Sequence, residues 1–347
     1  MTREAGEIDV KLFLVVLVVV VAAVGVVAVL QLDTTGRSGS GLSDAFSYDL
    51  TELTRVDPNL ILYEEVGQPL NTGFVLSRAI ALDSNGRIFV TGDKAIRIFS
   101  RPGSLQRIID IAGEPRCLTV ADDGKVYVGV EDHVEVWDSS GRRLASWQPL
   151  GEEAVLTSIA KYKDSVFVAD AGHRVVLHYD LAGNLIDFIG EKDPDRNIPG
   201  FVVPGPHMDV AVSRDGLLRV VNPGRHRIEA YTLEGDLEFW WGEPSAKIEG
   251  FCGCCNPVNF ALLPDQGFVT SEKGLVRVKV YNSDGGFVGV VAGHEQLTDG
   301  VQAKICETPE ECQGAGLDVA ADADGRIYIL DPPENVIRIF ARKEARP

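Results

Sequence analysis

The stretch "RAIALDSNGRIFVTGDKAIRIF", from Arg78 to Phe99, decides the fold. It has a short strand of alternating apolar residues, a polar turn from Asp83 to Gly86, and a second strand. A second turn and a third strand follow, and the third strand ends in an aromatic residue. The stretch therefore predicts three short strands joined by tight turns.

The same pattern returns five more times along the chain. The copies are "RCLTVADDGKVYVGVEDHVEVW" from Arg116, "LTSIAKYKDSVFVADAGHRVVLHY" from Leu156, "HMDVAVSRDGLLRVVNPGRHRIEAY" from His207, "VNFALLPDQGFVTSEKGLVRVKVY" from Val258 and "GLDVAADADGRIYILDPPENVIRIF" from Gly316. A fourth strand follows most copies, for example "LASWQPL", "LIDFIG", "LEFWWG" and "FVGVVAG". Four-stranded units repeated at about 40–55 residues, with no helical periodicity between them, are typical of β-propeller blades.

The chain ends predict how the ring closes. The sixth copy ends after its third strand, at Phe340, and "NLILYEEVG" from Asn59 is an extra strand before the first copy. If the two share one blade, no sheet edge is left exposed. We therefore expect an all-β, six-bladed propeller over residues 59–341, closed by the N-terminal strand and followed by a tail at 342–347.

Three of the repeats suggest a family. "VADAGHRVVLHY", "VVNPGRHRIEAY" and "ILDPPENVIRIF" resemble the NHL repeat family, whose units carry an Asp, a short turn with Asn or His, and then Arg-Ile and an apolar strand. Gly92, Val130 and Glu272 depart from this pattern, since they stand where the Asp would be. The resemblance, to a membrane-anchored bacterial-type member, implies the fold but no single activity, because such propellers bind protein, bind RNA or act as enzymes.

The N-terminal region predicts a membrane anchor. The run "LFLVVLVVVVAAVGVVAVL", Leu12–Leu30, is uncharged and long enough to cross a bilayer, whereas a cleaved signal peptide, the alternative, has a shorter apolar region and a small-residue cleavage site. We expect an uncleaved transmembrane anchor over 12–32 and a flexible linker, rich in glycine and serine, over 33–58.

Basic residues suggest the orientation of this anchor. Arg3 and Lys11 precede the apolar run, and the first basic residue after it is Arg37. The imbalance favours a cytoplasmic N-terminus at residues 1–11 and a periplasmic or extracellular propeller. The formal net charge of -18, with no basic cluster to offset it, disfavours nucleic acid as a partner.

Repeat alignment places several polar residues on one face of the propeller. The innermost strands begin at Ala79, Cys117, Thr157, Asp209, Asn259 and Asp318. The second strands end on the same face, at Gly92, Val130, Asp170, Asn222, Glu272 and Asp331. Carboxylates and amides of the later blades would thus surround one mouth of the channel.

This mouth is a candidate divalent metal site. Oxygen ligands suit Ca²⁺, and six-bladed lactonases of the gluconolactonase type hold a metal in a comparable place. The candidate ligands, for Ca²⁺ or Zn²⁺, are Asp209, Asn259, Glu272 and Asp318, together with His207, which no repeat rule explains. The alternative is that an Asp at the end of a second strand orders its own turn, and that His133, His173 and His226 only pack their turns.

The six cysteines also fall on this face. Cys252, Cys254 and Cys255 lie in "GFCGCCNPVNF" from Gly250, Cys306 and Cys312 lie in the next link, and Cys117 begins an inner strand. Two interpretations remain open. In the first, the cysteines form disulfides; in the second, some of their thiols act as soft ligands for Cu(I), Zn²⁺ or an iron–sulfur centre, or as an exchangeable redox pair. The spacing C-x-C-C matches no strong zinc pattern. A bond between the neighbours Cys254 and Cys255 would form a strained, easily reduced ring.

No catalytic motif points to one reaction, so three functions remain. The first, which we favour, is a membrane-tethered binding or scaffold module whose disulfide-braced, cysteine-rich face docks an envelope protein. The second is an extracytoplasmic, metal-dependent hydrolase or lyase at the channel mouth. The third is a thiol redox or metal-handling protein that uses the cysteine cluster. We also expect one of Trp240 and Trp241 to be buried and the other to wall the cysteine segment.

Overall fold

The computed structural model describes residues 14, 16–22, 53–101, 103–298 and 316–344. The chain divides into two compact units, Met1–Asp49 and Leu50–Pro347. In the first unit, residues 14 and 16–22 are helical. Within the described ranges, no helix has both the length and the hydropathy needed to span a bilayer. Most of the predicted anchor at 12–32 and of the linker at 33–58, the whole of 1–11, and part of the tail at 342–347 lie outside the described residues.

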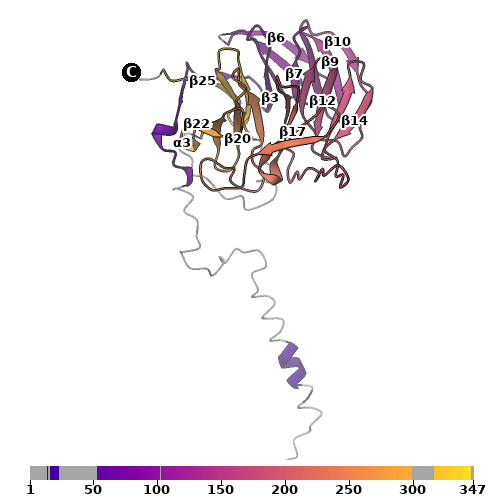
Figure 1. The fold of residues 1–347 in the computed structure, drawn as a ribbon, viewed down its shortest axis with the longest axis vertical. Helices are drawn as coiled ribbons and strands as arrows, with labels where there is room; N and C mark the ends of the chain where they lie inside the picture. The colour runs from indigo at the N-terminus through magenta and orange to yellow at the C-terminus, as the bar shows by residue number, and fades with distance from the viewer. Residues whose placement is uncertain (1–13, 15, 23–52, 102, 299–315, 345–347) are drawn as a thin grey trace, which may run out of the picture. The chain divides into compact units, whose positions relative to one another are not determined.

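The second unit is a ring of six antiparallel sheets, as predicted (Figure 1). The strands of blades 1 to 3 are β3 (Ser77–Leu82), β4 (Ile88–Gly92), β5 (Ala95–Phe99), β6 (Leu105–Asp110), β7 (Pro115–Val120), β8 (Lys125–Val130), β9 (His133–Asp138), β10 (Arg143–Ser146), β11 (Leu156–Tyr162), β12 (Ser165–Asp170), β13 (Val175–Asp180) and β14 (Leu185–Ile189). Blades 4 and 5 contain β15 (Val210–Val212), β16 (Leu218–Asn222), β17 (Arg227–Tyr231), β18 (Leu237–Trp241), β19 (Asn259–Leu262), β20 (Phe268–Glu272), β21 (Arg277–Tyr281) and β22 (Phe287–Ala292). Among the described residues of this unit, the short helix η2 (Pro58–Leu60) precedes the first strand, and η3 (Pro223–Arg225) and α3 (His294–Leu297) lie between strands.

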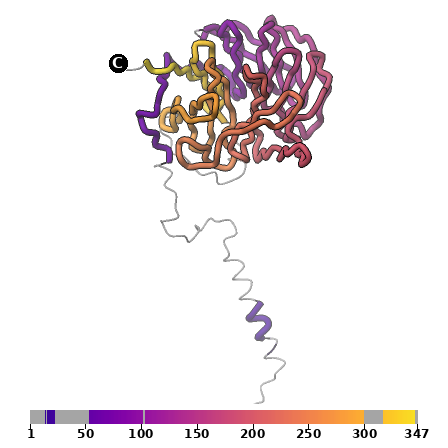
Figure 2. The backbone as a smooth tube through the Cα atoms, in the orientation of Figure 1, coloured from indigo at the N-terminus to yellow at the C-terminus, as the bar shows by residue number. Residues whose placement is uncertain are grey.

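Blade 6 combines both ends of the propeller. It contains β23 (Asp318–Ala321), β24 (Ile327–Asp331) and β25 (Val336–Arg342), and β1 (Tyr63–Glu65) completes it by pairing antiparallel with β25. The register sets Tyr63 opposite Arg342 and Glu65 opposite Phe340, and β2 (Leu70–Asn71) pairs with the other end of β25. The indigo N-terminal segment and the yellow C-terminal segment accordingly run side by side (Figure 2). The predicted closure is confirmed.

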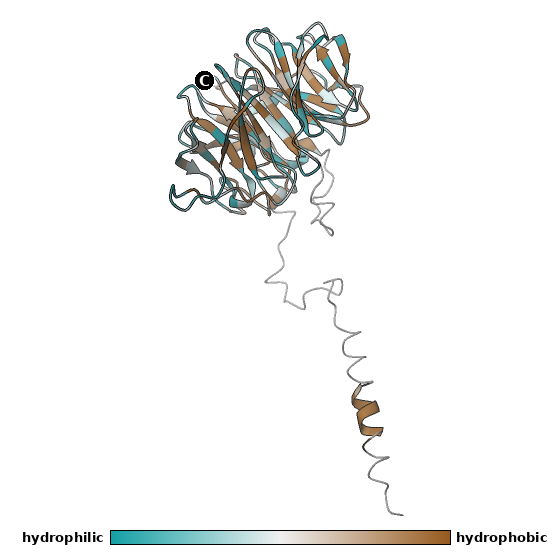
Figure 3. Cartoon of the chain, turned by 90° about the vertical axis from the view of Figure 1, so that its right-hand side faces the viewer, coloured by the Kyte–Doolittle hydropathy of each residue, from teal (hydrophilic) through white to brown (hydrophobic). Residues whose placement is uncertain are grey.

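Repeated local chemistry explains why each blade forms. In blade 1 the turn before the second strand begins at Asp83, whose Oδ1 accepts the backbone N–H groups of Asn85 (3.0 Å) and Arg87 (2.8 Å). Asp322 repeats this arrangement before β24, and Asp138 and Asp180 repeat it before the fourth strands β10 and β14. The second strands are almost entirely buried on both faces and mostly apolar, although some carry a polar residue such as Arg219 or Asp331; Figure 3 shows brown within the strands and teal mainly in the loops.

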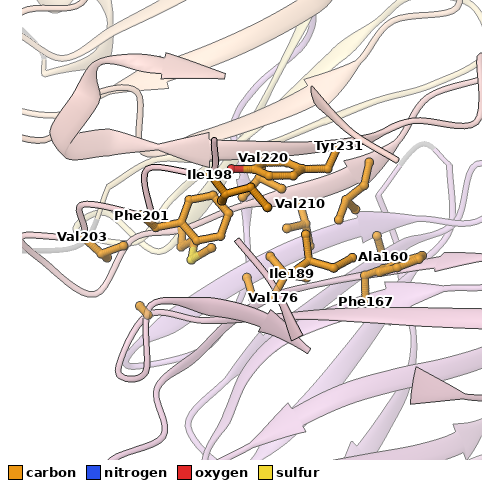
Figure 4. Packing of buried hydrophobic residues seen from close by; sticks show 14 residues of the cluster. Ala160, Phe167, Val176, Ile189, Ile198, Phe201, Val203, Val210, Val220 and Tyr231 are labelled. Carbon is orange, nitrogen blue, oxygen red and sulfur yellow. The ribbon is translucent and has the colours of Figure 1, made fainter. Parts of the chain in front are cut away.

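The core lies between neighbouring blades. One cluster joins Phe167 and Val176 of blade 3 to Val220 and Tyr231 of blade 4 (Figure 4). Similar clusters lie between the other blades. The first strand of every blade lies innermost, where β3, β7, β11, β15, β19 and β23 contact one another in a ring. The starts of these six strands therefore define one mouth of the channel.

Candidate functional site

The two predicted aspartates at the channel mouth join neighbouring blades. Asp209 accepts the backbone N–H of Phe260, in the next blade, at 2.7 Å, and that of Val210 at 2.8 Å. Asp318 accepts the N–H of Ile80, in blade 1, at 2.8 Å, and that of Val319 at 2.9 Å. Both carboxylates thus use both oxygens to tie their own inner strand to the next one.

These carboxylates share their surroundings with Cys117, so alternate blades contribute a set of three. Burial raises the pKa of Asp209 to about 6. Burial, and next the negative charge of Asp209, raise the pKa of Asp318 to about 7. The pKa of Cys117 is raised to about 12, chiefly by burial, with both carboxylates adding to the effect. The charge of Asp209 therefore acts on both Asp318 and Cys117, and that of Asp318 acts on Cys117.

Two other inner-strand positions also make contacts between blades. Asn259 donates through Nδ2 to the carbonyl of Leu317 at 2.9 Å. In blade 3 the position equivalent to Asp209 is Ser158, whose Oγ accepts the N–H of Val210 at 3.3 Å. The predicted residue, Thr157, is therefore wrong by one place. Blades 1 to 3 share a bulge here, but the first hairpin of blade 3 is one residue shorter than that of blade 1, since Ser158 pairs with Ala169 whereas Ala79 pairs with Thr91.

Glu272 contacts basic residues of its own blade. Its Oε2 accepts from Nε of Arg277 at 2.6 Å, and its Oε1 lies 3.0 Å from Nζ of Lys279. All three side chains are buried, with 0–1% exposure. Burial lowers the pKa of Lys279 to about 8, although the charge of Glu272 opposes this. This carboxylate is engaged by two cations at the turn between β20 and β21.

The five predicted metal ligands do not form one cluster. Asp209, Asn259 and Asp318 lie at the starts of inner strands, Glu272 pairs with Arg277 and Lys279, and His207 lies in the link before β15, where its N–H donates to the carbonyl of Gly205 at 2.8 Å. Within the described ranges, no three His, Cys, Asp or Glu side chains are grouped closely enough to hold a metal ion.

Asp170, at the end of a second strand, orders its own turn, as the alternative interpretation held. Asp170 accepts the N–H groups of Val155 (2.9 Å) and Gly172 (3.0 Å) through Oδ1, and its Oδ2 lies 2.6 Å from Nδ1 of His173. Asn222 accepts the N–H of Val202 at 3.0 Å. Asp170 thus ties a link between blades to a turn within its blade, whereas Asn222 ties a link to Glu229 of β17 through a bond of 2.9 Å.

The cysteines Cys252, Cys254 and Cys255 lie in the link between β18 and β19, residues 242–258, which we call the cysteine link. Asn256, buried at 2% exposure, fixes its second half. Its Nδ2 donates to the carbonyls of Cys252 (2.5 Å) and Lys273 (2.9 Å), and its Oδ1 accepts the N–H of Lys273 (2.9 Å). Gly253 has a φ of 91°, a conformation that favours glycine. The segment is therefore held against the turn between β20 and β21.

Side chains of β21 hydrogen-bond the first half of the cysteine link. Nζ of Lys279 donates to the carbonyls of Gly250 (2.6 Å) and Ile248 (3.1 Å), and the hydroxyl of Tyr281 donates to the carbonyl of Glu249 (3.0 Å). The ammonium group also lies 4.6 Å from the centre of the Phe251 ring. Buried polar groups thus hold an exposed loop in one conformation.

Two of the cysteines are in contact. Sγ of Cys254 lies 3.2 Å from Sγ of Cys255. Cys254 is exposed, whereas Cys255 is buried, and the side chain of Lys273 hydrogen-bonds its sulfur. Burial, and next the contact with Cys254, raise the pKa of Cys255, while Lys273 opposes the rise. The four described cysteines are unbridged thiols, and Cys306 and Cys312 lie outside the described residues.

Two tryptophans of β18 precede the cysteine link. Trp241 is buried and its ring centre lies 6.1 Å from that of Phe251 in the link, whereas Trp240 is 53% exposed, which confirms that one tryptophan is buried and the other exposed. The guanidinium carbon of Arg227 lies 4.5 Å from the centre of the Trp240 ring, and Arg227 is itself held by Glu229 through a bond of 2.7 Å. The exposed ring is thus held by a cation that is already paired.

Sequence reasoning missed Lys273, Lys279 and the hydrogen-bonding role of Asn256. One signal was available for Lys279: it stands at an inward position of "RVKVY", between Arg277 and Tyr281. A basic residue at such a position needs buried partners. No local pattern marked Asn256, whose partner Lys273 belongs to another turn.

Comparisons with known proteins support the fold and do not extend to function. No protein-family model and no curated protein matches the chain. A solved streptogramin B lyase structure is similar at a TM-score of 0.56 and 10% identity, covering 81% of this chain and 98% of that one. A Bacteroides thetaiotaomicron protein of unknown function gives a TM-score of 0.58 and 16% identity, over 81% of this chain and 73% of that one. An inactive virginiamycin B lyase from Staphylococcus aureus, solved with quinupristin, gives 0.51 and 12%, over 76% and 80%. At these identities the likeness supports the β-propeller architecture alone.

Proposed function

We propose that the chain is a membrane-tethered binding or scaffold module, NHL-like in its repeats, with its propeller outside the cytoplasm. The uncharged run Leu12–Leu30 supplies the tether, and the basic residues Arg3 and Lys11 before it favour this orientation. The propeller fold supports a binding role, since it presents many loops on a rigid ring.

The docking surface we propose consists of Trp240, Arg227 and the cysteine link. One observation carries the proposal: an exposed tryptophan stands two residues before a loop that Asn256 and Lys279 hold by hydrogen bonds. Tryptophan and arginine dominate the binding energy of many protein interfaces, and a loop ordered in advance loses little entropy on binding. The partner is a protein of the cell envelope that sets an apolar side chain against the Trp240 ring.

Site-specific photocross-linking tests this docking surface. A benzophenone amino acid would replace Trp240 in one variant and Ile108 in another, because Ile108 is similarly exposed (48%) but belongs to β6 of blade 1. We expect one discrete cross-linked protein from position 240 in the native membrane and none from position 108. That product should also disappear when the unmodified full-length chain is co-expressed in excess, but persist when the competitor carries Trp240→Ala. Equal products at both positions would refute the proposed surface.

The orientation needs a separate measurement. Protease added outside the cytoplasmic membrane should digest the propeller while a cytoplasmic control protein stays intact. A propeller that resists until the membrane is dissolved would place it in the cytoplasm and overturn this part of the proposal.

A further inference from the structure

The contact between Cys254 and Cys255 is a local arrangement with a chemical consequence of its own. Their sulfurs are 3.2 Å apart, one exposed and one buried. An exposed thiol can meet an external disulfide, whereas a buried thiol beside it can meet only its neighbour. Cys254 is therefore placed as the attacking thiol and Cys255 as the resolving thiol of a disulfide exchange.

The surroundings keep the two sulfurs in this relation. Asn256 ties the segment to Lys273 at both N–H and carbonyl, and the Lys273 side chain hydrogen-bonds the Cys255 sulfur. A nearby cation stabilises a thiolate relative to the thiol. Lys273 is therefore placed to favour the Cys255 thiolate once Cys254 has reacted.

We propose that Cys254 and Cys255 form a reversible dithiol–disulfide couple that exchanges with an accessible disulfide, either a small molecule or a protein. The Cys254 thiolate attacks the external disulfide, forms a mixed disulfide and releases one thiolate. The Cys255 thiolate then attacks Sγ of Cys254 and releases the second. The two protons lost by the cysteines go to the two released thiolates, so that two thiols are oxidised and one disulfide is reduced. Because the ring between neighbouring residues is strained, it returns readily to the dithiol.

This inference does not depend on the proposed docking function, and thiol mapping tests it. The reduced full-length chain, in detergent, is equilibrated with mixtures of glutathione and its disulfide and quenched with acid. Free thiols are blocked with one alkylating reagent, and disulfide sulfurs are labelled with a second after reduction. Mass spectrometry then reads the tryptic peptide that follows Lys247 and ends at Lys273, which contains all three link cysteines.

The wild-type chain and Cys252→Ser should lose the Cys254 and Cys255 thiols together and recover them in excess glutathione. Cys254→Ser should remain reduced. Cys255→Ser and, as a second replacement for this buried position, Cys255→Ala should stop at a glutathione adduct on Cys254. A bond that uses Cys252, a bond from either cysteine to Cys306 or Cys312, or a lasting adduct in the wild-type chain would overturn the proposal.

Lys273 is assigned as a positioning residue, and its test is kinetic. Lys273→Met should lengthen the lifetime of the mixed disulfide on Cys254, and Lys273→Arg should restore rapid closure. Thermal unfolding of each variant checks that the fold is unchanged. Equal lifetimes in all three chains would remove Lys273 from the exchange.

Discussion

Replacing Glu272 with glutamine should destabilise the propeller more than any exposed charge substitution. The carboxylate is the anion that faces Arg277, at 2.6 Å, and Lys279, at 3.0 Å, in a site with at most 1% exposure. Glutamine has nearly the same shape and can still accept one hydrogen bond, so the variant mainly removes the negative charge. Two buried cations then face each other without compensation.

The expected cost follows from the burial of these groups. Removing one partner of a buried ion pair costs about 3–5 kcal/mol, whereas an exposed pair contributes about 0–1 kcal/mol. Because glutamine still accepts from Arg277, we expect a loss near the lower limit, about 3 kcal/mol. Lys279→Met should cost less than this, since Glu272 keeps Arg277 and the variant removes a lysine whose charged form burial already disfavours.

Urea denaturation of the full-length chain at two pH values provides the assay. The pKa of Lys279 is lowered to about 8 from 10.5, so the folded chain binds fewer protons than the unfolded chain between these values and gains stability as the pH rises. Without Glu272 this pKa should fall further. The loss caused by Glu272→Gln should therefore shrink between about pH 7 and pH 9.5 as Lys279 becomes neutral. Asp123→Asn, which breaks an exposed pair with Lys125, is the control. A loss below about 1 kcal/mol, or a larger loss in Lys279→Met, would refute the reasoning.

Three further predictions follow from the channel, the closing strand and the cysteine link. Asp318→Asn should flatten the pH dependence of stability, because a pKa raised from 3.8 to about 7 makes the folded chain retain a proton that the unfolded chain releases. The stability that Asp318 contributes is complete below about pH 4 and falls by up to about 1.4 kcal/mol per pH unit as the pH approaches 7. If urea titrations give variant and wild type the same slope of unfolding free energy against pH, the prediction is wrong. Tyr63→Ala should cost about 3–5 kcal/mol in denaturation experiments, since Tyr63 is buried in blade 6, and Glu64→Ala, exposed on the same strand, should cost less than about 1 kcal/mol. Asn256→Ala should leave the N–H of Lys273 without its acceptor and speed tryptic cleavage after Lys247, with cleavage after Lys192, in a different link, unchanged; a similar increase at both sites would point to general destabilisation instead.

The fold could be predicted from the sequence because its information is local and repeated. Alternation within each strand, turn residues such as Asp83, and a final aromatic recur six times, so each copy supports the others. The closure by β1 followed from counting strands, since Phe340 ends one strand short of a full blade. The first hairpin of blade 3, in which Tyr162 pairs with Ser165, lacks the turn glycine on which the other copies align, and the inner position of this blade was therefore misplaced by one residue.

The candidate site was less predictable because its partners come from distant parts of the chain. Repeat alignment placed Asp209 and Asp318 at the channel mouth but could not tell a free carboxylate from one that accepts the N–H of the next blade. Glu272 occupied the expected strand end, yet its partners lie along β21, after the turn. The contact between Cys254 and Cys255 depends on how Asn256 fixes the backbone, which no spacing rule describes.

The pairing of β1 with β25 sets the order of events during synthesis. Tyr63 is among the first residues of the propeller to be made, and its partner, Arg342, is among the last. Until Arg342 has left the ribosome, β25 cannot complete its pairing with β24 and β1 in blade 6. The earlier blades then form an open arc with unpaired edges. Contacts this far apart in sequence form slowly, so ring closure is expected to be a late step of folding. A chain cut short within β25 would remain an open arc prone to aggregation, so pairing of the closing strand also reports that the whole propeller has been made.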